Sequence, residues 1–312
     1  MTDISNPVPV PAAPAASGPA SRVETPFQRF ISDYMENKVA VASFCVFAVI
    51  LAIALLAPWI SPTNPHDLTQ VDIMNNRLPP GGKSWDGQVF WLGTDGQGRD
   101  MLSAIIYGLR TSLYVGATSG VIALCIGMTV GLTAAYAGGR VDSLIMRVVD
   151  LQLSFPTILV ALILLAALGR GVDKVIIALV VVQWAYYCRT VRAGALVERN
   201  KEYMEAARCL GLSHKRIVLN HLLPNCLPPM IVIGTVQIAH SIALEATLSF
   251  LGLGLPPTEP SLGLLISNGF EYMLSGRYWI SFFPGLALLV TIVSINLMGD
   301  QVRDVLNPRL QK

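Results

Sequence analysis

Six long apolar runs limit what this chain can fold into more than any other feature of its sequence. Each is close to the roughly 20 residues that a helix needs to cross the hydrocarbon of a bilayer. None has the alternating polar and apolar residues of a barrel strand. The runs cover residues 39–60, 111–136, 151–168, 175–187, 229–251 and 279–297. They predict an all-α polytopic membrane protein with six transmembrane helices.

Composition agrees with a chain that is largely surrounded by lipid. Charged residues make up 13% of the sequence, against the roughly 25% that is usual in soluble domains. The five cysteines and four histidines form no cluster at ligand spacing, so we expect no metal site and assign the cysteines to apolar packing. The motifs HExxH and GxSxG are absent, so a membrane-embedded enzyme is not indicated and we nominate no catalytic residue.

The apolar runs divide the chain into four regions. Residues 1–27 are rich in Pro, Ala and Ser, and such a segment buries too little apolar surface to offset the entropy lost on ordering. We expect it to be a disordered cytoplasmic tail. Residues 28–110 then hold the first transmembrane helix and a long external loop. Residues 111–300 form a five-helix core, and residues 301–312 a cytoplasmic C-terminal tail.

The distribution of basic residues predicts the orientation in the membrane. If the N-terminus is inside, the cytoplasmic segments carry 15 Lys and Arg and the outer segments carry 7. An excess of Lys and Arg marks the cytoplasmic side of a membrane protein. We therefore expect both termini to lie in the cytoplasm.

The second apolar run contains two pairs of glycines spaced four apart. They are Gly116 with Gly120 and Gly127 with Gly131. Small residues at this spacing let two helix backbones approach closely in lipid. We predict that this helix packs tightly against its neighbours at both pairs.

The longest cytoplasmic segment, residues 195–229, is too polar to cross the membrane, and turn residues divide it into two short helices. Asn200 is predicted to cap the first helix. Gly211 then supplies the left-handed residue that commonly ends a helix. Ser213 is predicted to cap a second helix, which Pro224 terminates.

One face of the first predicted helix is made of small and apolar residues at helical spacing. These are Tyr203, Ala206, Ala207 and Leu210. The opposite face carries Glu202, Glu205 and Arg208. A short helix of this kind, held between membrane spans, suits docking into a groove on a cytoplasmic partner.

These residues carry a resemblance to a known family. Glu205-Ala206-Ala207, then Gly211, then Leu223-Pro224 resembles the EAA-x3-G-x9-I-x-LP signature of bacterial ABC importer permeases. His221 stands where the general signature has Ile, and H-x-LPN is frequent in the peptide-importer branch. The chain is therefore similar to the C-type permease subunit of dipeptide and oligopeptide importers.

Three further blocks resemble the same branch, so that the resemblance covers about residues 30–310. They are LGTD with GRD at 92–100, EAxLSFLGLG at 245–254, and the stretch from Asn296-Leu297-Met298-Gly299-Asp300 to Leu310. The resemblance implies the type I ABC importer permease fold in a bacterial inner membrane. It also implies that the 195–229 loop is a coupling helix that docks on an ATP-binding subunit. The coupling residues would be Tyr203, Glu205, Ala206, Ala207, Gly211, Leu223 and Pro224.

The same resemblance implies the partners of the chain. They are a second homologous permease, two cytoplasmic ATP-binding subunits that would bind the ATP, an extracytoplasmic solute-binding protein and membrane lipid. No cofactor of the chain's own and no nucleic acid are expected. The implied solute is a dipeptide or oligopeptide, with a nickel chelate or another small solute as the alternative.

Glu245 lies well inside the fifth apolar run. A carboxylate at membrane depth should face protein or a water-filled path, because exposing it to lipid is costly. Two roles stay open: a structural carboxylate that is hydrogen-bonded to a neighbouring helix or loop, and a residue of the transport pathway. We favour the structural role.

An ion-driven secondary transporter is the main rival interpretation. That class commonly shows inverted repeats, broken helices and several charges at the bilayer midplane. The sequence shows no convincing internal repeat, and Glu245 is almost alone at depth. An ATP-driven importer is therefore the preferred interpretation.

The glycines of residues 93–98 suggest a phosphate-binding loop. The segment lacks the Gly-Lys-Ser/Thr ending of such loops and lies on the predicted outer side. We expect a turn that leads into the second span.

Overall fold

The computed structural model describes residues 26–67 and 72–306 of the chain. Nearly all of the predicted tail at 1–27 therefore lies outside the described residues. The C-terminal helix continues to Leu306, into the region predicted as a tail, and residues 307–312 lie outside the description.

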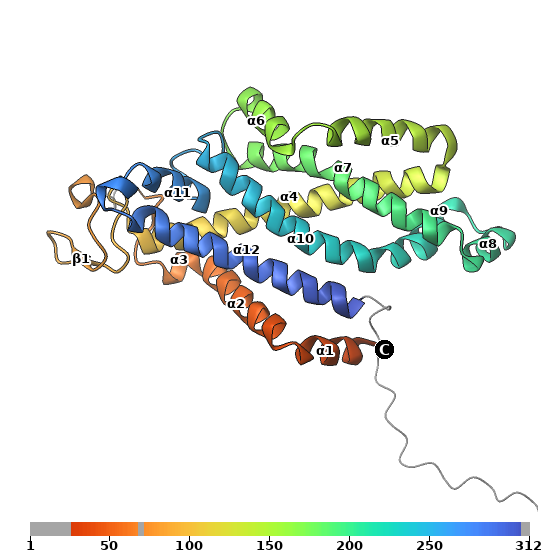
Figure 1. Cartoon of the computed structure of the whole chain (residues 1–312), viewed down its shortest axis with the longest axis horizontal. Helices are drawn as coiled ribbons and strands as arrows, with labels where there is room; N and C mark the ends of the chain where they lie inside the picture. Colours follow the sequence, from red (N-terminus) through yellow and green to blue (C-terminus); the bar gives the residue numbers. More distant parts are fainter. Residues whose placement is uncertain (1–25, 68–71, 307–312) are drawn as a thin grey trace, which may run out of the picture.

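Five long helices form the body of the described structure, and each is long and apolar enough to cross a membrane. They are α2 (Lys38–Leu55), α4 (Met101–Ala137), α7 (Val172–Arg199), α10 (Leu223–Phe250, counted with the turns from His214) and α12 (Trp279–Leu306). In Figure 1 they run roughly along the long axis of the molecule. This arrangement confirms the prediction of an all-α polytopic membrane protein.

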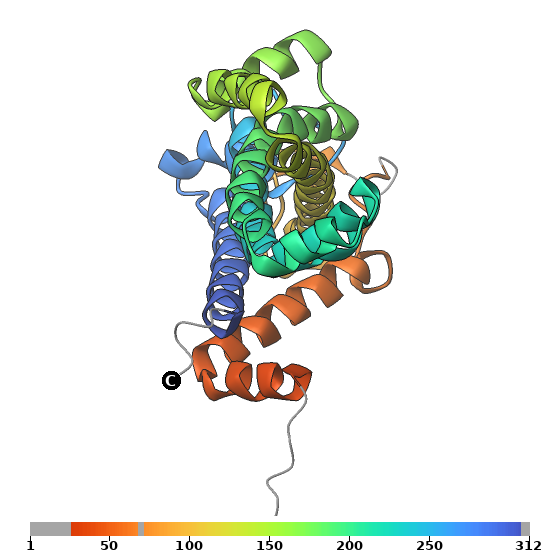
Figure 2. The ribbon, with the colours of Figure 1, turned by 90° about the vertical axis from the view of Figure 1, so that its right-hand side faces the viewer.

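Shorter elements connect and flank the long helices. They are α1 (Pro26–Glu36), α3 (Ala57–Ile60), α5 (Gly139–Leu153), α6 (Thr157–Leu168), α8 (Glu202–Cys209), α9 (His214–Arg216), α11 (Leu262–Phe270) and an antiparallel pair of two-residue strands, β1 (Gly82–Lys83) and β2 (Val89–Phe90). The strands and α11 lie at one end of the molecule and α8 at the other (Figure 1). Viewed along the long axis, α5 and α6 lie on the opposite side of the bundle from α1 and α2 (Figure 2).

The third predicted span, residues 151–168, is not one straight helix. α5 ends at Leu153, α6 begins at Thr157, and the two are bent by 87°. Pro156 explains the break, because proline lacks the amide hydrogen of a helical bond and disfavours helix in the residue before it. If the bent pair is counted as one span, the described part of the chain has six candidate spans, as predicted.

α4 begins at Met101 and not at residue 111, where the second span was predicted to start. The side chain of Asp100 caps the helix by accepting a hydrogen bond of 2.9 Å from the Ser103 amide. Met101 and Ala104 are fully buried. The helix therefore extends beyond its most apolar part because contacts with other parts of the protein stabilise its first turns.

The two glycine pairs of α4 face two different helices, and both predicted close contacts are confirmed. A Cβ atom on Gly127 would lie 2.6 Å from the Trp184 carbonyl oxygen of α7, and one on Gly131 would lie 2.6 Å from the Cys188 carbonyl oxygen. Gly116 and Gly120 instead meet isoleucine side chains of α10. The glycines thus bring α4 into direct contact with α7 and α10.

Gly-rich residues 93–98 form a tight turn before α4, as predicted. Asp95 and Arg99 form an ion pair of 2.7 Å, and their side chains are only 1% and 3% exposed. Asp95 Oδ1 also accepts hydrogen bonds from the amides of Gln97 and Arg99. Gly98 has φ +84°, and a Cβ there would lie 2.2 Å from the Asp72 carbonyl oxygen, so the turn requires glycine at this position.

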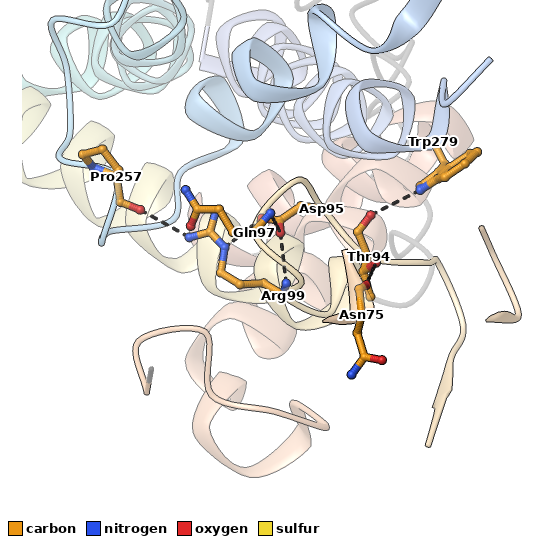
Figure 3. A network of polar contacts seen from close by, with 7 residues as sticks. All are labelled: Asn75, Thr94, Asp95, Gln97, Arg99, Pro257 and Trp279. Atoms are coloured by element: carbon orange, nitrogen blue, oxygen red, sulfur yellow. Dashed lines mark hydrogen bonds and ion pairs between the residues drawn. The ribbon is translucent and has the colours of Figure 1, made fainter. Parts of the chain in front are cut away.

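This turn joins segments that are far apart in the sequence (Figure 3). The Arg99 guanidinium donates to the Pro257 carbonyl oxygen at 3.3 Å. The Trp279 indole donates to the Thr94 carbonyl oxygen, also at 3.3 Å. The start of α4 is therefore fixed to the start of α12 and to the loop before α11.

Replacing Gly127 by Ala should destabilise the protein, because the added methyl group overlaps the α7 backbone. We expect a loss of about 1–3 kcal/mol, the usual cost of overpacking. Thermal unfolding of the purified protein in detergent measures the change. Gly285→Ala in α12 is the matched control, since no atom lies within 4 Å of its added Cβ. Equal unfolding temperatures for the two variants would contradict the close contact of α4 and α7.

Replacing Asp95 by Ala should leave the buried Arg99 charge without a partner. Breaking one side of a buried ion pair costs about 3–5 kcal/mol, so we expect a large fall in the unfolding temperature. Asp86→Ala, at an exposed position between β1 and β2, should change stability by no more than about 0.5 kcal/mol. A small effect at Asp95 would mean that water reaches the pair.

Candidate functional site

The loop that the sequence singles out lies at one end of the bundle and begins where α7 ends. The sequence predicted that Asn200 caps α8, and this prediction was wrong. The Asn200 amide bonds to the last turn of α7 as the C-cap of that helix, and Lys201, with an extended backbone, precedes α8. The prediction was wrong by one residue because α7 continues to Arg199, well beyond the apolar run that ended at residue 187.

A carboxylate at the end of α7 fixes the turn into α8. Glu198 accepts a hydrogen bond of 2.7 Å from the Lys201 ammonium and another of 2.7 Å from the Tyr203 hydroxyl. Burial and the hydrogen bond to Glu198 together raise the pKa of Tyr203 to about 12. Tyr203 therefore stays a neutral donor at physiological pH. The sequence analysis missed Glu198. The signal for its ion pair with Lys201 was the spacing of three residues between them.

The inward face of α8 differs from the predicted one. Met204 and Ala207 are its buried residues, and they join a cluster with residues of α4, α7 and α10. The sequence predicted that Ala207 shares its face with Tyr203, Ala206 and Leu210. These three side chains are exposed, Leu210 to 78%. The prediction overlooked Met204, which is the largest side chain that α8 buries.

The outward residues of α8 are available to another molecule. Glu205, Ala206 and Leu210 are exposed, and Tyr203 is 36% exposed. Because Met204 and Ala207 anchor the other side, the helix has one face attached to the membrane bundle and one face free. A force on the free face would be transmitted through the anchored one.

Gly211 ends α8 in the left-handed conformation that the sequence predicted, with φ +67°. The Leu212 amide bonds to the Ala207 carbonyl oxygen, and the Gly211 amide bonds to the Arg208 carbonyl oxygen. This pair of bonds is the Schellman motif, in which the residue after the C-cap is normally glycine. No other atom lies within 4 Å of a Cβ on Gly211, so the backbone angle alone demands glycine.

The second predicted helix does not stop at Pro224. α9 continues through a π-helical turn, Ile217–Leu222, directly into α10. Pro224 is the second residue of α10, which directly follows the π-helical turn. Leu223 is half-buried and Pro224 is exposed. The sequence analysis took the proline as a terminator, but the chain is helical on both sides of it.

Glu245 is completely buried in the last turns of α10, toward α11. Its carboxylate accepts hydrogen bonds from the Ser112 hydroxyl of α4 at 2.8 Å and from the Ser249 hydroxyl at 2.7 Å. These contacts are the ones expected of a structural carboxylate. They link α10 to α4 far from α8.

Comparison with known proteins places the chain in a family. A profile described as "Binding-protein-dependent transport system inner membrane component" matches residues 127–312. A second, described as "N-terminal TM domain of oligopeptide transport permease C", matches residues 25–80. One solved structure of the MetNI methionine ABC transporter, in inward-facing conformations, aligns with a TM-score of 0.55 and 22% identity over 66% of this chain and 97% of that chain. That likeness supports the fold.

Named relatives match nearly the whole chain. The di/tripeptide transport system permease protein DppC of Pseudomonas aeruginosa is 37% identical over 95% of this chain and 96% of its own length. The dipeptide transport system permease protein DppC of Escherichia coli K12 is 39% identical over 92% and 95%. A putative peptide transport system permease protein of Brucella suis is 41% identical over 84% and 85%. The chain is therefore a multi-pass membrane protein that belongs to the family of binding-protein-dependent transport system inner membrane components.

Proposed function

We propose that the chain is the permease subunit of an ATP-driven importer of dipeptides or oligopeptides, in which it forms half of the translocation path. The observation that carries this proposal is the match over more than nine-tenths of the chain to relatives named as dipeptide and di/tripeptide permeases. The subunit performs no covalent chemistry. ATP is bound and hydrolysed by partner subunits.

α8 is the proposed coupling helix. Its exposed residues, including Glu205, Ala206 and Leu210, dock on a cytoplasmic ATP-binding subunit. Met204 and Ala207 join an apolar cluster with residues of α4, α7 and α10, and α8 directly contacts the π-helical turn that leads into α10. A displacement of α8 therefore acts on the long helices through this cluster. Gly211 and the contacts of Glu198 keep the helix rigid during that displacement.

The proposed assembly has one more permease, two ATP-binding subunits and an extracytoplasmic binding protein. The end of the bundle with α8 faces the cytoplasm, together with both termini, and the end with β1, β2 and α11 faces outward. The excess of Lys and Arg in the segments assigned to the cytoplasm supports this orientation. The binding protein delivers the solute to the outer end.

Uptake by the complete transporter in proteoliposomes tests the function. We expect import of a radiolabelled dipeptide to require ATP on the side of α8 and the binding protein on the other side. Omitting either should abolish import. Uptake driven by an ion gradient, without ATP-binding subunits, would contradict the proposal. A binding protein that retains a nickel chelate and no peptide would overturn the proposed solute.

Replacing Gly211 by Val should uncouple ATP hydrolysis from transport. A β-branched residue at φ +67° is strained by about 1–3 kcal/mol, so the Schellman turn is lost and α8 loses its fixed orientation. Uptake should fall sharply, while the amount of permease in the membrane stays unchanged. Gly211→Asn is the matched control, because Asn tolerates left-handed backbone and should keep most of the uptake. Normal ATP-dependent uptake by the Val variant would exclude a coupling role for this turn.

A further inference from the structure

A groove of about 760 Å³ opens between α7, α10 and α12. Residues 225, 228, 229, 232, 233, 236 and 237 of α10 line it. These positions recur three and four residues apart, so they form one continuous face of α10 over more than three turns. Tyr186 and Glu198 line the groove from α7, and Arg303 lines it from α12.

Two polar side chains carry this groove into the membrane-spanning part of the bundle. Gln237 lies inside the apolar run at 229–251, and Tyr186 lies at the α8-side end of the run at 175–187. Tyr186 is the fifteenth of the 28 residues of α7, and Gln237 is the fifteenth of the 28 residues of α10. Tyr186 is 46% exposed and Gln237 is half-buried. Within the described part of the chain, neither side chain makes a hydrogen bond to protein. His240, one turn beyond Gln237 on the same face, is also exposed.

Polar side chains at this depth are not suited to lipid. Inside a membrane they face the interior of a bundle or a water-filled cavity, because hydrocarbon offers no hydrogen-bonding partner. The exposed residues elsewhere on the long helices are mostly apolar, for example Ile231 on another face of α10 and Ile177 on another face of α7. Polarity therefore distinguishes the groove from the lipid-facing surface.

The charged residues of the groove lie only at its end near α8. Glu198 is at the end of α7 and is hydrogen-bonded to Lys201 and Tyr203. Arg303 is near the end of α12 and has no ion pair among the described residues. Farther from α8 the groove offers the Tyr186 hydroxyl and the Gln237 amide between apolar walls. Such a surface can exchange hydrogen bonds with a polar solute without holding it by a fixed charge.

We infer that this groove is the wall that the subunit contributes to the translocation path, and that Tyr186 and Gln237 contact the solute there. The class of solute is a zwitterionic molecule with amide groups, whose donors and acceptors match these side chains. The inference rests on the proposed function and adds the route that the solute takes. In the assembled transporter the second permease would face this groove and complete the path.

Labelling of single cysteines tests the route. The five native cysteines are replaced by Ala, and Tyr186→Cys, Gln237→Cys and the control Ile231→Cys are made in that background. Inside-out membrane vesicles with the complete transporter, free of nucleotide, are treated with a negatively charged, membrane-impermeant methanethiosulfonate. We expect the two groove cysteines to react at least about a hundredfold faster than Ile231→Cys, because a charged reagent is excluded from hydrocarbon. Added dipeptide should slow their labelling, and the label should block uptake.

Other outcomes separate the route from the function. Slow labelling of both groove cysteines in a transporter with ATP-dependent uptake would overturn the route and leave the proposed function intact. Fast labelling without ATP-dependent uptake of peptide would support a water-filled groove and overturn the proposed function. If Gln237→Cys fails to assemble, Val236→Cys, which lines the same groove, replaces it.

Discussion

The close contact of α4 with α7 and α10 is the constraint on which the rest of the structure depends. α4 makes its most extensive contacts with these two helices, and four glycines remove the side chains that would hold the backbones apart. In lipid the hydrophobic effect does not drive helices together, so association rests on close van der Waals packing and on interhelical hydrogen bonds. The hydrogen bond from Ser112 of α4 to Glu245 of α10 is such a bond.

The bundle is held at both ends by polar contacts together with apolar packing. At the end with β1, β2 and α11, the Asp95 and Arg99 pair joins the start of α4 to the loop before α11, and Met101 packs there in an apolar cluster. At the end with α8, Met204 and Ala207 attach α8 to the bundle by packing, and Arg192 forms an ion pair with Asp142. Buried ionic contacts need specific geometry, and the Asp95 and Arg99 pair is the more buried of these two ion pairs.

The spans could be predicted from the sequence because each one is a continuous run of apolar residues. The turn at Gly211 was also predicted correctly, since a glycine after a helical stretch commonly adopts the left-handed conformation that ends a helix. The end of α7 could not be predicted, because charged residues interrupt the segment from Arg189 to Arg199 and its helix is stabilised by contacts with distant segments. The role of Pro224 was predicted wrongly, because the sequence does not show that the π-helical turn before this proline continues into α10.

The residues of the candidate site also divide into those that the sequence predicted and those that it missed. Glu205, Ala206 and Gly211 were found from a motif, and their exposure agrees with an outward face. Met204 and Glu198 were missed, because each acts through a contact with another element and neither belongs to a recognisable pattern. The groove was also invisible in the sequence. Tyr186 and Gln237 lie in different apolar runs, and only the packing of α7 beside α10 places them on one surface.

The connectivity of the chain relates the two proposals. α8 lies between α7 and α10 in the sequence, and these are the helices that line most of the groove. Glu198 takes part in both regions, since it lines the mouth of the groove and bonds to Lys201 and Tyr203 at the start of α8. Asn225 lines the same mouth from the first turn of α10. A displacement of α8 would therefore act on one side of the groove mouth through Glu198, and on the other side through α9 and the π-helical turn that lead into α10. Under the proposed function, motion of a cytoplasmic ATP-binding subunit would in this way change the width of the path.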